Sequence, residues 1–245
     1  MTPEQENAII DLRSRSLAPK QIARQLGLRP AEVSSFLKAQ AEQTAATKAA
    51  SGELDPLHQC LVNKNCLPGL RGEVIATSDE DSSKDEDDAP GMAVVMVSRK
   101  AGFNKITVCT YLVDLWCLGV KDASGPRQVD PVMYRDFVAY AYDPFPEGTE
   151  EISLEMAQAI VFGGIEYAAK LGFQPHRDFE QARSQLAEWS GEPKLTFGRN
   201  GKPCYFQGPY DDDLKIMRTL RQNVGEGNFD YVLAIDMDRS TLRFI

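Results

Sequence analysis

The side chains that could do chemistry in this sequence are a few acids, one cysteine and one histidine, all from residue 114 onward. Cys117 and His176 are the pair that a thiol hydrolase needs, in which the imidazole takes the proton of the nucleophile. Cys117, however, lies in the most apolar block of the chain, Tyr111–Asp122, where a cysteine is usually buried and inert. The other candidates are carboxylates, namely Asp114, Asp122, Asp178 and the run Asp211–Asp213.

Each of these groups also has a structural explanation. Asp211–Asp213 precedes an amphipathic stretch and suits the N-cap of a helix. His176 can cap the next helix or bond a backbone carbonyl, and Asp114 needs a hydrogen-bonded partner if it is buried, either Arg177 or a turn near Gly172. The sequence has no glycine-rich phosphate loop, nucleophile elbow or His-Glu-x-x-His motif. We therefore expect no catalytic residue, with a Cys/His hydrolase as an alternative.

The cysteines indicate reduced thiols and no metal. There are five, an odd and scattered set, which favours a cytoplasmic protein over one with a disulfide framework. His58, Cys60 and Cys66 are possible zinc ligands, but they number three and include no Cys-x-x-Cys pair. We expect no metal, no cofactor and a short apolar segment packing onto a neighbour here.

Composition and charge limit the partners. The chain has 245 residues, of which 42% are hydrophobic, as in a globular protein. No apolar run approaches the length of a membrane span, and the first residues lack a secretory signal. The net charge is +2 over residues 1–50 and −11 over the rest, which together make −9. If any part binds nucleic acid, we expect it to be the first 50 residues.

The first 40 residues have the pattern of three short helices. Ile9 and Leu12 are apolar positions of the first, and Pro19 is well placed to begin the second. Gly27 suits the tight turn that follows, since a positive φ costs little only for glycine. A third helix opens at Pro30 and places apolar residues on one face at helical spacing, namely Val33, Phe36 and Leu37.

The string from Gln21 to Leu37 resembles the helix-turn-helix of bacterial DNA-binding proteins, especially sigma-factor region 4 and response-regulator domains. The resemblance covers about residues 5–40 and implies that the third helix lies in the major groove. Arg29 would read a guanine, and polar side chains around it would contact phosphates or face the groove. The expected nucleic-acid-binding residues are Lys20, Arg24, Arg29, Ser34, Ser35 and Lys38.

An alternative is a module that docks on a protein or a ribonucleoprotein such as the ribosome or polymerase. The third helix is poor in Arg, Asn and Gln, the side chains that read bases best. One such unit beside an acidic domain should bind duplex DNA weakly, so a homodimer or a second anchor would be needed for a tight site.

The fold class is α+β: a small all-α trihelical helix-turn-helix domain (1–45), a linker (46–90) and a larger α+β domain (91–245) for sensing, dimerisation or docking. The linker contains Thr77–Pro90, with seven acids and one lysine, which is typical of a disordered stretch. In the large domain, strands and helices do not alternate regularly. The expected strands are 93–98 with 105–115, 195–197 with 203–207, 229–235 and 241–245, and the expected helices are 131–142, 153–171, 178–189 and 211–223.

Residues 92–213 resemble a bacterial protein family to which no reaction is attached. The segments that carry the resemblance are Tyr111–Asp122, the helix around Gly163-Gly164, Gly172–Phe179 and Phe197–Asp212. The resemblance implies domain identity and no mechanism. Within it, we expect Tyr111–Asp122 to be a central strand that leaves the core, with Trp116 and Leu118 packed beneath the long glycine-bearing helix.

Overall fold

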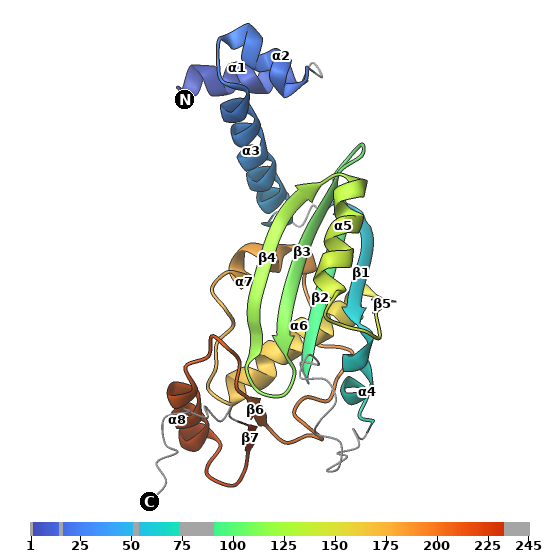
Figure 1. Ribbon diagram of the computed structural model, residues 1–245, viewed down its shortest axis with the longest axis vertical. Coiled ribbons are helices and arrows are strands. Elements are labelled where there is room, and N and C mark those ends of the chain that lie inside the picture. The colour runs from blue at the N-terminus through green and yellow to red at the C-terminus, as the bar shows by residue number, and fades with distance from the viewer. Residues whose placement is uncertain (1, 15–16, 51–53, 74–90, 233–245) are drawn as a thin grey trace, which may run out of the picture.

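A computed structural model describes residues 2–14, 17–50, 54–73 and 91–232 (Figure 1). Its first three helices meet through an apolar cluster whose buried members are Ile9, Leu12, Ile22, Ala23 and Val33. Figure 1 shows the first two helices gathered at the start of the third helix, which then extends toward a sheet. The helices are α1 (Pro3–Ser14), α2 (Pro19–Leu26) and α3 (Pro30–Ala50).

The rest of the described chain is built on a five-stranded antiparallel sheet with the order β4-β3-β2-β1-β5. The β2–β3 hairpin was expected, and it is confirmed. Mixed helix and antiparallel sheet also confirm the α+β class. The strands are β1 (Leu57–Asn63), β2 (Met92–Lys100), β3 (Ile106–Asp114), β4 (Gly119–Val129) and β5 (Thr149–Ile152).

Both faces of the sheet are covered because alternate residues of its strands are apolar on each side. One face packs against α6 (Leu154–Lys170) and the short α7 (Phe179–Ala182) through residues such as Val95 and Tyr111. The opposite face packs against α5 (Pro131–Tyr142) through residues such as Met96 and Val108. Figure 1 shows α5 in front of the sheet and α6 behind it.

The helices α5 and α6 begin and end where their capping residues predict. The Asp130 carboxylate accepts hydrogen bonds from the backbone of Val132 and Met133, and Pro131 is the first helical residue of α5. The Ser153 hydroxyl accepts from Met156 N at the start of α6. After Leu171, Gly172 takes a φ of 95°, which ends that helix.

Part of the expected linker is ordered structure. Within residues 46–90 the chain forms β1, which lies between β2 and β5, and α4 (Leu67–Leu70) after a 3-10 turn. The acidic stretch Thr77–Pro90 lies outside the described residues. No strand was expected at β1 from the sequence, because the partners that make it a strand come later in the chain.

Two expected elements after α6 are wrong. The helix expected over 178–189 is only α7 followed by the 3-10 helix η2 (Arg183–Leu186), and Ala187 then takes a φ of 60°. In the described chain, the expected hairpin of 195–197 with 203–207 is reduced to one antiparallel bridge, between Arg199 and Lys202. The strand β6 (Cys204–Phe206) pairs in parallel with β7 (Asp230–Val232). The strand expected at 241–245 lies outside the described residues.

The helix α8 (Asp213–Asn223) packs between β6 and the turn that follows β3, in a cluster with Cys117, Leu118 and Tyr205. Its side-chain cap is Asp212, which accepts from Lys215 N, and not the expected Asp211. No helix in the described ranges has the length and apolarity needed to cross a membrane.

Candidate functional site

The turn between α2 and α3 is set by a glycine and a capping pair. Gly27 has a φ of 67°, and its N–H donates to Ala23 O at the end of α2. A Cβ there would meet no atom within 4 Å, so the backbone conformation alone favours glycine. At the start of α3, Glu32 Oε2 accepts from Arg29 N at 3.2 Å, which fixes Arg29 at the N-terminal end of that helix.

All six residues that the sequence predicts to bind nucleic acid are exposed. Lys20 and Arg24 are one turn apart on α2, and Arg29 stands just before α3. Val33, which points inward from α3, is buried in the cluster with α1 and α2. The helices therefore hold an apolar inner side and a polar outer side that carries Lys20, Arg24, Arg29, Ser34, Ser35 and Lys38.

Asp114 is buried at the turn between β3 and β4, and its partners are local. Its Oδ1 accepts from Trp116 N at 2.9 Å and from Cys117 N at 3.0 Å, so it is held by its own turn and not by Arg177 or a turn near Gly172. Burial raises the pKa of this carboxyl, and the backbone hydrogen bonds oppose that rise. The Asp114 side chain shapes the turn that joins the two strands.

Tyr111–Asp122 does not leave the core as a strand. The chain turns back after Asp114, which pairs with Gly119, and continues as β4. Trp116 packs in the cluster that contains α6, as expected, whereas Leu118 packs in the cluster with α8. The apolar block therefore forms the β3–β4 turn and the strand ends beside it, and it contributes to both the cluster with α6 and the cluster with α8.

Cys117 and His176 do not form the pair that a hydrolase needs. Cys117 is fully buried in the apolar cluster beside α8, and burial raises the pKa of its thiol. The His176 side chain is 38% exposed, and the groups facing its Nδ1 atom are Asp122 and Asp178. The geometry gives Cys117 no base among these contacts.

His176, Asp122 and Asp178 come together at the free edge of β4. His176 Nδ1 lies 3.7 Å from Asp122 Oδ1 and 3.7 Å from Asp178 Oδ2. All three residues are candidates in the sequence, which does not place them together. The signal it lacked was the position of the loop before α7, which His176 N anchors by donating to Val120 O at 2.9 Å.

The other acidic and zinc candidates have separate roles in the described structure. Asp211 forms an ion pair with Lys121 at 2.8 Å, which joins the loop before α8 to β4. His58 packs edge-on against Tyr134 on the α5 side of the sheet, whereas Cys60 is buried on the α6 side. Cys66 donates through Sγ to Asn63 O at 3.1 Å.

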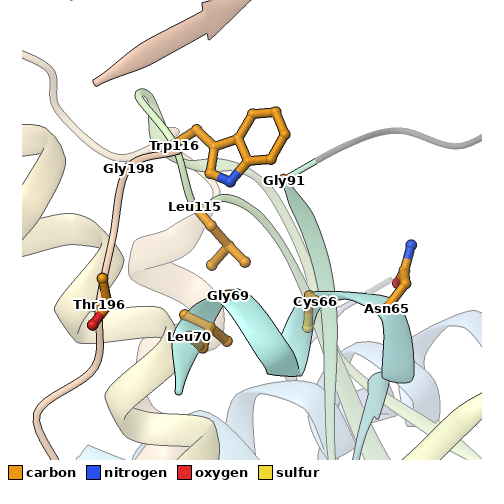
Figure 2. A pocket seen from close by; sticks show the side chains of 9 residues that line it. All are labelled: Asn65, Cys66, Gly69, Leu70, Gly91, Leu115, Trp116, Thr196 and Gly198. Carbon is orange, nitrogen blue, oxygen red and sulfur yellow. The ribbon is translucent and has the colours of Figure 1, made fainter. Parts of the chain in front are cut away.

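Two hollows were not expected from the sequence. One is a small cavity of about 30 Å³ beneath Leu115 and Trp116, above α4 (Figure 2). It has room for about one water and none for a substrate. The other is a groove of about 240 Å³ between α5 and the strands β2–β4, lined by apolar and aromatic residues such as Phe137 and Tyr140, and by Asp122.

The chain matches no protein-family model, no curated protein and no solved structure.

Proposed function

We propose that this chain is a DNA-binding regulatory protein in which α1–α3 form a helix-turn-helix domain. The observation that carries the proposal is the arrangement of α2, Gly27 and α3. The two helices pack through Ile22, Ala23 and Val33, and their predicted contact residues remain on the outside. In this role α3 enters the major groove and α2 crosses the backbone.

The position of Arg29 supports the proposal. Residues at the N-terminal end of a recognition helix are those that reach base edges. The cap from Glu32 to Arg29 N fixes the backbone there, and the Arg29 side chain is exposed. A guanidinium in this place can donate two hydrogen bonds to a guanine, while Lys20 and Arg24 reach phosphates from α2.

The distribution of charge also supports it. Residues 1–50 carry +2 in an otherwise acidic chain. Figure 1 shows α1, α2 and the start of α3 at the end of the molecule that lies away from the sheet. This separation reduces the repulsion between DNA phosphates and the acidic part of the chain, which falls off over about 8–10 Å at physiological salt.

The test uses the full chain and a pool of random duplexes, from which bound sequences are selected and then measured by fluorescence anisotropy at several salt concentrations. The double variant Arg29→Ala/Lys38→Ala should weaken binding at least tenfold. The slope of log binding constant against log salt concentration should fall in magnitude by about 2 if each residue contacts one phosphate. It should fall by about 1 if Arg29 contacts only a base. The matched control is Arg135→Ala/Lys170→Ala, which removes the same charge from exposed sites on α5 and α6. Equal affinity for the two double variants would refute the proposal.

The alternative is that the same helices bind a protein or ribonucleoprotein assembly. The observation that favours it is Glu32, an exposed carboxylate in the first turn of α3, where it would face phosphates. Purification from the native cell before and after nuclease treatment separates the two functions. A partner retained after nuclease treatment, with no sequence preference among duplexes, would favour the assembly.

A further inference from the structure

The edge of β4 brings an imidazole and two carboxylates to one point, from parts of the chain that are far apart in sequence. One ligand atom from each of Asp122, His176 and Asp178 lies within 4.8 Å of the others. A metal bound by three such atoms at about 2.0–2.2 Å would hold them roughly 3–4 Å apart. The two distances of 3.7 Å from His176 Nδ1 are within that range. A small rotation of a half-exposed carboxylate would bring the oxygens of Asp122 and Asp178 to a similar distance from each other.

The backbone is shaped to present Asp122 at this point. The register between β3 and β4 shifts where Leu112 faces Asp122 and Val113 faces Val120, so β4 has an extra residue here. Such a bulge re-aims a side chain and is common beside functional sites. The hydrogen bond from His176 N to Val120 O then holds the histidine next to the bulge.

The chemistry of the three groups calls for a cation. His176 Nδ1 accepts a hydrogen bond from Asp178 N at 3.4 Å, which is consistent with a lone pair on the nitrogen that faces both carboxylates. The other described neighbours are Arg177, whose Nε lies 3.6 Å from Asp178 Oδ1, and Ala123 N, which donates to Asp122 Oδ1. Two carboxylate oxygens therefore face the imidazole nitrogen, each at 3.7 Å.

The geometry points to a binding site for a divalent transition-metal cation, such as Zn²⁺, formed by Asp122, His176 and Asp178. One nitrogen and two oxygen ligands suit Zn²⁺ better than Mg²⁺ or Ca²⁺, which prefer oxygen alone. Three protein ligands leave a position for water or a small ligand. Asp122 also lines the groove beneath α5, so the metal borders a hollow of about 240 Å³. No metal was expected from the sequence, and this site does not depend on the proposed DNA binding.

The test is a titration of the chelator-treated full chain with Zn²⁺ against a fluorescent competitor. We expect one bound ion per chain, and at least tenfold weaker binding for His176→Gln and for Asp122→Asn. The matched controls are His58→Gln, since the chain has two histidines, and Asp136→Asn on the exposed side of α5. Both controls should bind as the wild type does.

A second measurement separates this site from the five thiols. With Co²⁺ in place of Zn²⁺, ligation by one imidazole and two carboxylates gives weak visible bands and no sulfur-to-cobalt charge-transfer band. Charge-transfer absorption, unchanged affinity in His176→Gln, or no uptake of Zn²⁺ by the wild type would each overturn the proposal.

Discussion

A Cβ on Gly119 of β4 would lie 2.8 Å from the carbonyl oxygen of Gly164 on α6. A second contact is as close: a Cβ on Gly164 would lie 2.8 Å from Cγ1 of Val113, on β3. The long helix therefore rests directly on the backbone of the β3–β4 hairpin. This contact confirms that Gly163-Gly164 lets another element approach closely.

Gly119→Ala should lower the free energy of unfolding by roughly 2–5 kcal/mol, because it adds both a clash and backbone strain. The φ of Gly119 is 68°, and its Cβ would also lie 2.8 Å from Ala168 Cβ. Gly148→Ala is the matched control, with a φ of 75° and no atom within 4 Å of the new Cβ. Urea unfolding followed by tryptophan fluorescence measures both. Equal losses would mean that α6 moves aside without cost.

Arg99→Met should lower the free energy of unfolding by roughly 2–4 kcal/mol, because it leaves buried carbonyls without a donor. Arg99 is 5% exposed, and its Nε and Nη2 donate to Gln185 O while Nη1 donates to Asp55 O. Arg135→Met, on the exposed side of α5, should change stability by less than about 0.5 kcal/mol. A loss no larger than that of the control would mean that water satisfies both carbonyls.

Asp114→Asn should become more stable relative to the wild type as pH rises. Burial raises the pKa of Asp114 in the folded state above its ordinary value of 3.8. The contribution of such a group to stability is complete below the unfolded pKa and is lost as pH rises through the folded pKa. Asparagine does not titrate, so it avoids this loss. Urea unfolding at about pH 3.5 and about pH 8, with Asp136→Asn as control, measures the difference, and a constant difference would contradict the pKa shift.

The cysteines should resist alkylation in the folded protein. Burial raises the pKa of Cys60, Cys66 and Cys109 to about 12, and it also raises the pKa of Cys117 and Cys204. A thiol with a pKa of 12 is thiolate in about one molecule in ten thousand at pH 8. Iodoacetamide followed by mass spectrometry should find these residues unmodified until urea is added. Rapid labelling of Cys117 would restore it as a candidate nucleophile.

Local signals predicted α5 and α6 well because the boundaries of these two helices depend on nearby residues. Asp130 and Ser153 fix the starts of α5 and α6 through hydrogen bonds within three positions, and Pro131 is the first helical residue of α5. The strands β1 and β5 were not predicted, since β5 is short and polar and is defined by pairing with β1. The Asn200-Gly201 turn favoured a local hairpin, but β6 pairs with a strand that follows α8.

The two candidate sites also differ in how far the sequence predicts them. The exposed residues of α2 and α3 follow from helical spacing, so their positions were predictable once the helices were. The cluster of Asp122, His176 and Asp178 depends on a strand bulge and on a loop bound to the edge of β4. Neither feature leaves a pattern in a single sequence, although each residue had been named for its chemistry.

The place of β1 determines how this protein can be divided. β1 lies between β2 and β5, and its residues precede the acidic stretch while those of β2 follow it. A fragment beginning at Gly91 would therefore present the unpaired backbone of β2 along a run of apolar side chains. An open edge of this kind recruits strands from other molecules. Loss of β1 would then turn a folded sheet into a template for aggregation, whereas a fragment that begins ahead of Leu57 keeps the sheet whole.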